Sequence, residues 1–292
     1  MESATTPQYQ PAVPVPPVAA AKMKRSIPRL VSGGLLLIGL ALLKLKGLAI
    51  LLIEKIRLLL VNPFEGFGAI QFAVAGGSIV ATVAAYAMTK YPLGLVIGFV
   101  LITLVHEIGH AVVIRAKGLR TGYMVFIPFV GGAVTMKDQA RTAYDDAQIG
   151  LAGPIAGTFA SLVALQIFKW TDHPLYLLIA LAGFILNLFN LLPIGPLDGG
   201  RISAAVTKWM WVIGGGILTY KAISQPNALL ILVLVLSLFQ VYASILREKK
   251  EDKYYEVTVA QRAAIAIAYF SLVIFLGHQT FIVFERVAAL AR

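Results

Sequence analysis

Residues 101–114 read Leu101-Ile-Thr-Leu-Val-His106-Glu107-Ile-Gly-His110-Ala-Val-Val-Ile114, an apolar run that contains two histidines and a glutamate. On a helix, His106 and His110 share one face because they are four residues apart, so they can bind one metal ion together. Glu107 lies beside the first histidine and can act as a general base toward water at that metal. Ionisable groups inside an apolar span are costly in lipid and are functional by default. A polar cluster that only holds helices together is the alternative interpretation.

The composition predicts that this run lies in a membrane. Apolar residues make up 59% of the 292 residues and charged residues only 13%, against about 25% in soluble domains. The mean hydropathy is +0.82. We therefore expect an all-α polytopic membrane protein with about six transmembrane helices. The expected spans are residues 67–88, 92–115, 146–167, 175–192, 228–246 and 262–284, while 209–223 is short and rich in glycine.

The charges and the lack of cysteine narrow the classes of partner. The formal net charge is +11. Because the basic residues gather in loops between apolar runs, we expect them to favour anionic lipid at one side of a bilayer, and we expect no nucleic-acid partner. With no cysteine in the chain, a metal must be held by histidine and carboxylate.

Four regions follow from the distribution of apolar and polar residues. Residues 1–28 are expected to be a disordered proline-rich tail. Residues 29–66 are apolar but interrupted by charges, which is typical of an interfacial segment or a hairpin. Residues 67–246 form the expected membrane domain, with its core at 93–205, and residues 247–292 a basic loop and a C-terminal transmembrane helix. The basic clusters at 22–29, 115–120 and 247–253 are predicted to be cytoplasmic.

A third metal ligand is expected because a catalytic zinc takes three protein ligands and keeps one position open. Asp198 is the best candidate, in the stretch Asn190-Leu-Leu-Pro193-Ile-Gly-Pro196-Leu197-Asp198-Gly199-Gly200, where proline and glycine interrupt an apolar span. Irregular backbone at membrane depth occurs only where it is buried or lines a cavity. The predicted topology brings His110 and Asp198 near the same membrane face, and His106 lies about 13 Å along the helix from Arg115. A surface turn with an aspartate is the alternative.

Together these two motifs resemble those of the site-2 protease family of intramembrane zinc metalloproteases. The resemblance covers about residues 93–205 and implies that His106, His110 and Asp198 bind one Zn²⁺ ion, with Glu107 as the base. It implies that Asn190 holds the substrate backbone or stabilises the developing oxyanion. The segment Phe126–Met136, with Gly131 and Gly132, resembles the family's membrane-associated β-hairpin, which binds extended substrate. The segment 150–157 resembles the start of the middle core helix, where glycines permit close packing.

The implied activity is zinc-dependent endoproteolysis in or near the transmembrane segments of membrane proteins, in a bacterial cytoplasmic membrane with the active site toward the cytoplasm. With about thirty residues between the spans ending at 115 and beginning at 146, an intervening PDZ domain is not expected. A zinc transporter is one alternative, although its transit path usually needs further ligands and the chain has only four histidines. An inactive relative that binds membrane segments is another, and the intact Glu107 argues against it. The oligomeric state is left open.

Overall fold

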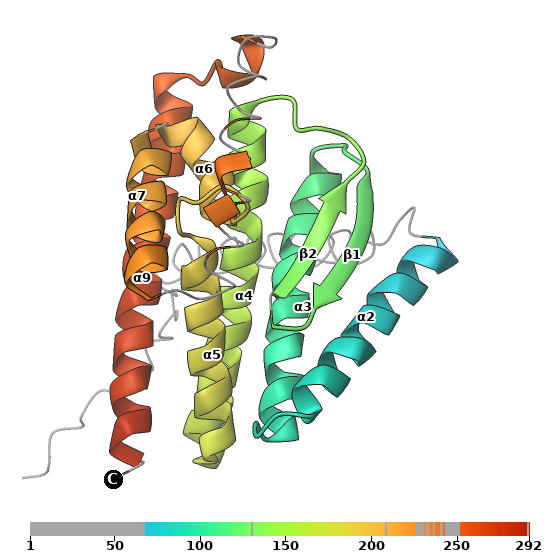
Figure 1. Cartoon of the computed structure of the whole chain (residues 1–292), viewed down its shortest axis with the longest axis vertical. Coiled ribbons are helices and arrows are strands. Elements are labelled where there is room, and N and C mark those ends of the chain that lie inside the picture. The colour runs from blue at the N-terminus through green and yellow to red at the C-terminus, as the bar shows by residue number, and fades with distance from the viewer. Residues whose placement is uncertain are drawn as a thin grey trace, which may run out of the picture. The chain divides into compact units, whose positions relative to one another are not determined.

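The computed structural model describes residues 68–129, 131–207, 209–225 and 252–290, with Arg292 and a few positions between 231 and 242. The predicted tail at 1–28 and the segment 29–66 lie outside the described residues, as does most of the span expected at 228–246. In chain order the elements are α2 (Ala69–Ala87), α3 (Leu93–Ala116), β1 (Thr121–Ile127), β2 (Gly131–Met136), α4 (Ala143–Thr171), α5 (Pro174–Asn190), α6 (Asp198–Val206), α7 (Trp209–Ser224), the 3-10 helix η2 (Asp252–Tyr255) and α9 (Val259–Leu290) (Figure 1).

Four helices, α2, α3, α4 and α9, are long and apolar enough to cross a membrane, with 19, 24, 29 and 32 residues. Helix α5 is also apolar but has 17 residues, fewer than the roughly 20 that a bilayer requires. The structure therefore supports a mostly helical membrane protein with a small antiparallel sheet. The expected total of about six spans stays a prediction.

Local sequence signals explain where the core helices begin and end. The Thr142 side chain caps α4 by accepting a hydrogen bond of 3.1 Å from the Asp145 backbone N–H. Asp145 and Asp146 lie in the first turn, where carboxylates interact favourably with the helix dipole. Pro174 occupies the first turn of α5, where its missing N–H costs nothing. Helix α5 ends at Asn190, just before the proline-containing loop.

Helix α4 lies at the centre of the described bundle and packs against α3, α5, α6 and α9. Small residues let these helices touch, as in other membrane bundles. A Cβ added at Gly109 of α3 would lie 2.6 Å from the Ala152 carbonyl oxygen of α4, and one at Gly157 of α4 would collide with Asn187 of α5. The close packing expected from the glycines of 150–157 is therefore present.

The predicted hairpin is present and is longer than expected. It was expected over Phe126–Met136, but β1 begins at Thr121 and pairs antiparallel with β2, so that Met124 lies opposite Val134 and Phe126 opposite Gly132. The earlier start is consistent with the content of Tyr, Val, Phe and Ile in β1, residue types that favour strands. Phe129 takes a positive φ of 63° in the turn.

Helix α2 covers the outer edge of β1. The Phe126 backbone N–H donates to Ser78 Oγ at 3.1 Å, and Thr82 Oγ1 donates to the Phe126 carbonyl at 3.2 Å. The backbone N–H and C=O of Phe126 therefore point away from β2. In an antiparallel pair the opposite residue, Gly132, then points its own backbone groups away from β1. The same holds for Val134, because this pattern repeats every two residues. The outer edge of β2 is the one near α3 (Figure 1).

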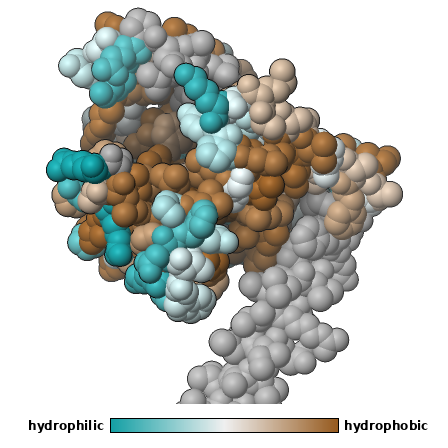
Figure 2. All heavy atoms as spheres, turned by 90° about the horizontal axis from the view of Figure 1, so that it is seen from below, coloured by the Kyte–Doolittle hydropathy of each residue, from teal (hydrophilic) through white to brown (hydrophobic). Residues whose placement is uncertain are grey.

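Apolar side chains cover much of the surface of the described helices. Figure 2 shows one face on which hydrophobic residues predominate and hydrophilic residues form small groups. Large side chains such as Ile70, Val80, Leu101, Phe159 and Ile274 are more than half exposed. Such a surface is typical of a protein whose surrounding solvent is lipid.

Candidate metal centre

Helix α3 buries all three polar residues of the first motif, with the two histidines facing α4 and α5 and Glu107 facing the hairpin. His106 and Glu107 are each 3% exposed and His110 is 4% exposed. The two imidazole rings lie nearly perpendicular, with centroids 4.8 Å apart. The spacing of four residues therefore places both rings at one point of the helix surface, as the sequence predicted.

Asp198 reaches the same point from the loop that follows α5. It is the first residue of α6 and is 8% exposed. The loop folds back tightly, and a Cβ at Gly199 would collide with the carbonyl oxygens of Leu191 and Leu192. A Cβ at Gly200 would lie 2.8 Å from the Gly195 carbonyl oxygen. The path of the loop thus requires the two glycines that follow Asp198.

Neighbouring helices hold this loop through its backbone carbonyls. Tyr269 of α9 donates its hydroxyl to the Leu191 carbonyl at 2.7 Å, and Trp211 of α7 donates its indole N–H to the Gly200 carbonyl at 2.8 Å. Arg201 pairs with Asp146 at the start of α4 at 2.6 Å, and the Tyr254 hydroxyl donates to the same carboxylate at 2.9 Å. The position of Asp198 is therefore set by α4, α7, α9 and η2 together.

Three donor atoms converge in this site. The Nε2 atoms of His106 and His110 are 3.0 Å apart. Asp198 places Oδ2 3.1 Å from His106 Nε2 and Oδ1 3.2 Å from His110 Nε2. Donors on one tetrahedral zinc with bonds of about 2.0–2.1 Å lie about 3.3 Å apart. The observed separations are close to that value.

Each histidine is oriented by a hydrogen bond at its other ring nitrogen. His106 Nδ1 lies 2.8 Å from Asn187 Oδ1, and His110 Nδ1 lies 2.7 Å from the Ile149 carbonyl oxygen. Since a carbonyl oxygen only accepts, both Nδ1 atoms carry the proton, and the Nε2 lone pairs face the site. Sequence analysis missed Asn187. The signal was an amide inside an apolar helix, three residues before Asn190.

Two further observations fit a metal ion at this point. Asp198 Oδ2 is buried and has no hydrogen-bond partner among the described residues, since the His106 Nε2 that faces it carries no proton. Buried carboxylate oxygens without a partner are rare and call for an unseen ion or water. A Cβ at Gly153 of α4 would lie 2.7 Å from His106 Nε2 and would also collide with His110 Nε2. The residues present therefore fit a bound divalent cation such as zinc.

Glu107 lies outside the group of three donors and contacts the hairpin. A Cβ at Gly132 would lie 2.7 Å from Glu107 Cγ and 2.8 Å from Oε1. The Glu107 carboxylate also accepts a hydrogen bond from the backbone N–H of Val134. Glycine at position 132 thus admits the Glu107 side chain, a contact that the sequence did not indicate.

A family profile described as Peptidase family M50 matches residues 94–173 and 165–235, which contain all three donors and Glu107. The chain belongs to peptidase family M50, the site-2 protease family. A protein named zinc metalloprotease from Methanocaldococcus jannaschii is 32% identical over 106 residues, 35% of this chain and 30% of the relative. Relatives from Synechocystis and Mycobacterium tuberculosis, provisionally named zinc metalloproteases, are 32% and 31% identical over 47% and 37% of this chain. The aligned part of the chain spans about a third of the length of these relatives.

The other two residues that the family resemblance nominated belong to the end of α5 and the start of β2. Asn190, in the last turn of α5, is half-buried and donates its side-chain amide to the Leu186 carbonyl at 3.1 Å. Gly131 begins β2 with a φ of +130°, a conformation that favours glycine, and a Cβ there would meet no atom within 4 Å. Their functional roles stay predictions.

In this M50 member an ion pair joins the two ends of the hairpin that lie opposite the turn. Arg120 and Asp138 form a bidentate pair, with Nη2 2.6 Å from Oδ1 and Nε 3.0 Å from Oδ2. The hydrogen bonds that the Arg120 side chain donates lower the pKa of Asp138 to about 2. No PDZ domain separates α3 from α4, because the described residues between them form only the hairpin and its short connections.

Proposed function

We propose that this M50 chain is a zinc-dependent endopeptidase that cleaves peptide bonds in or near the transmembrane segments of membrane proteins. The observation that carries the proposal is the convergence of three buried donor atoms, with a fourth polar residue beside them, among helices of which several are long enough to span a bilayer. The chain crosses a bacterial cytoplasmic membrane about six times, and its site opens toward the cytoplasmic side, where the basic clusters gather.

His106 and His110, through Nε2, and Asp198, through its carboxylate, hold a single Zn²⁺ ion. Zinc bound there supplies Lewis-acid chemistry, polarising the scissile carbonyl and making water more acidic. Asn187 and the Ile149 carbonyl keep the two imidazoles in the tautomer that presents Nε2 to the metal.

Glu107 is the general base. Its carboxylate is buried beside the three donors but belongs to none of their contacts, so it is available to take a proton from the attacking water. It then passes that proton to the nitrogen of the leaving amine. The Val134 N–H and the close approach of Gly132 hold the carboxylate in place.

The substrate binds in extended form along β2. The outward-facing backbone groups of Gly132 and the Val134 carbonyl lie on the edge of β2 nearest to Glu107, and an extended peptide can pair with such an edge. Gly131 and Gly132 let that peptide approach closely, and the Asn190 amide binds its backbone or the developing oxyanion. The partners are therefore a transmembrane protein substrate and the lipid bilayer.

A zinc transporter is the second candidate. Transport requires a series of sites across the bilayer, and in the part of the chain that the structure describes only His106, His110 and Asp198 form a group of potential metal ligands. An inactive relative would not require Glu107 beside the metal ligands. Both observations favour a hydrolase.

Glu107→Gln in the full-length protein tests the proposal. We expect cleavage of a membrane-segment substrate to fall by about a thousandfold or more, with one zinc per chain retained, because Glu107 is a base and not a ligand. Glu285→Gln on the exposed face of α9 is the matched control and should leave cleavage unchanged. Zinc content by mass spectrometry, cleavage by gel analysis and zinc uptake into proteoliposomes are measured on each variant. Zinc uptake without cleavage would identify a transporter.

A further inference from the structure

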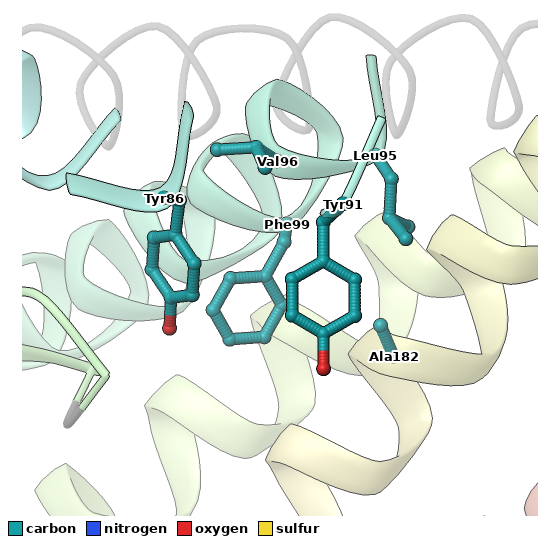
Figure 3. Close-up of a pocket in the computed structure, with 6 residues that line it drawn as sticks. All are labelled: Tyr86, Tyr91, Leu95, Val96, Phe99 and Ala182. Atoms are coloured by element: carbon teal, nitrogen blue, oxygen red, sulfur yellow. The ribbon is translucent and has the colours of Figure 1, made fainter. Parts of the chain in front are cut away.

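A cavity of about 280 Å³ lies between α2, α3 and α5 (Figure 3). The rings of Tyr86, Phe99 and Tyr91 point into the space that Ala182 of α5 faces from the other side. We call this cavity the aromatic pocket; its lining residues are Tyr86, Tyr91, Leu95, Val96, Phe99 and Ala182. Because the walls are aromatic and aliphatic, they suit an apolar occupant.

The aromatic pocket continues toward the metal centre. A second, narrow cavity shares Tyr86 and Phe99 with it and reaches Thr103 and Gly131. Thr103 lies one helical turn before Glu107, and Gly131 precedes Gly132, the residue that contacts Glu107. This narrow cavity, of about 10 Å³, therefore lies between the aromatic pocket and the start of β2, along which an extended substrate would lie.

Two lengths along the chain estimate how far the pocket lies from Glu107 and its contacts in β2, where the scissile bond would lie. Phe99 precedes Glu107 by eight residues of α3, or about 12 Å at 1.5 Å per residue. Along β2, the step from Val134 to Gly131 at the mouth of the narrow cavity is about 10 Å. An extended peptide covers either distance in three or four residues.

The size of the cavity admits a large side chain. Its volume of about 280 Å³ lies just below the roughly 300–1,000 Å³ of pockets for whole small molecules. We propose that the aromatic pocket is a specificity pocket that receives a bulky apolar side chain of the substrate's transmembrane segment, three or four residues from the scissile bond. This inference rests on the proposed endopeptidase function, because the occupant is the substrate of that reaction.

Tyr86 connects the pocket with the hairpin. Its ring centroid lies 6.1 Å from that of Phe99 and 4.7 Å from that of Phe129 in the hairpin turn. A side chain seated against Tyr86 and Phe99 therefore also stabilises the turn that precedes Gly131. Filling the pocket aligns the edge of β2 with the substrate, so the effect appears in kcat as well as in KM.

The first test uses purified full-length zinc enzyme in proteoliposomes and model substrates with one alanine- and leucine-based transmembrane segment. The cut is mapped by mass spectrometry, and one phenylalanine then replaces alanine at each position within six residues of it. We expect phenylalanine at one register, three or four residues away, to raise kcat/KM about tenfold. The gain is moderate because lipid is itself apolar, so discrimination comes from packing.

Ala182→Leu places a side chain in the pocket and should abolish this tenfold preference. Ala84→Leu adds the same atoms to an exposed position of α2 and should preserve it. A preference that survives Ala182→Leu, or an equal effect of phenylalanine at every register, overturns the specificity pocket while the protease function stands.

The second test does not depend on cleavage. The chain contains no cysteine, so Ala182→Cys in a Glu107→Gln background offers a single thiol for disulfide formation with one cysteine scanned along the substrate segment. We expect cross-linking in one register, about tenfold above that of Ala84→Cys. Cross-linking in one register, combined with no cleavage of the same substrate by the enzyme that retains Glu107, contradicts the protease and retains the pocket. Equal cross-linking at both enzyme positions overturns the pocket, and co-purified lipid in that case identifies an acyl chain as its occupant.

Discussion

Helices α3 and α4 and helix α2 are all long enough to span a membrane, yet they are packed very differently. In an apolar stretch of 18 residues, 56% of α3 and 50% of α4 is buried inside the protein, but only 11% of α2. Of the two tightly packed helices, α3 carries the two histidines proposed as metal ligands and α4 packs against them through Gly153, whereas α2 holds the hairpin and lines the aromatic pocket. Rigid metal geometry therefore rests on close packing, and the residues proposed to handle substrate lie on the loosely packed side.

Glycine-to-alanine substitutions in α4 and α2 test this difference in packing, and the substitution in α4 has the largest expected effect. In Gly153→Ala the new Cβ would collide with both histidine Nε2 atoms. We expect zinc to be lost and cleavage to fall by about a hundredfold or more. The zinc content per chain and kcat/KM are measured on the purified variant, and a thermal unfolding transition confirms that the protein is folded.

Gly77→Ala on α2 is the matched control, since a Cβ there meets nothing within 4 Å. It should retain zinc and stabilise α2 by about 0.5–1 kcal/mol, because alanine restricts the unfolded chain. Equal zinc loss in both variants would show that the two regions are packed alike.

Asn187→Ala removes the oxygen that orients His106. We expect zinc affinity to fall about 10–100-fold, measured by competition with a chelating dye. Asn187→Asp keeps an acceptor oxygen and should restore much of the affinity, and Asn190→Ala should leave zinc affinity intact because its amide bonds the Leu186 carbonyl. A greater loss of zinc in Asn190→Ala than in Asn187→Ala would reverse the assignment.

Val134→Pro removes the backbone donor to Glu107 and constrains φ. We expect cleavage to slow about tenfold while zinc is retained, because the metal ligands lie on α3 and α6. Val134→Ala keeps the N–H and is the control. If the proline variant loses zinc, the hairpin supports the metal centre as well as the base.

The smallest effect concerns the ion pair at the open end of the hairpin. The folded pKa of Asp138, about 2, is below its unfolded value of about 3.9. The stabilisation it contributes is therefore complete above about pH 4 and is lost as the pH falls through about 2. Carboxyl NMR titration should place this pKa, and Arg120→Gln should return it toward about 3.9.

The two motifs could be read from the sequence because their spacing is local. His106 and His110 share a helix face whatever surrounds them, and the prolines and glycines around Asp198 mark a broken span. The hairpin was also predictable in kind, although its first strand begins at Thr121 and not near Phe126. The start of a strand depends on the residues it pairs with, here Met136 of β2, which lies opposite Thr121.

The contacts that orient the two histidines could not be predicted from the sequence. Which amide of α5 faces His106 depends on the rotation of α5 about its axis relative to α3, and packing placed Asn187 there and Asn190 elsewhere. Gly153 and Gly132 likewise matter because of the side chains opposite them, which belong to other elements.

By itself the sequence determined a membrane protein with a histidine, glutamate and aspartate constellation of the M50 type, since composition and helical periodicity act within short stretches of chain. Only the tertiary structure decided which groups orient the histidines, what holds Glu107 and where the aromatic pocket lies. Those contacts join residues far apart along the chain, as His106 and Asn187 do across 81 positions. They exist only once the helices have packed, because local backbone preferences contain no information about the rotation of one helix against another.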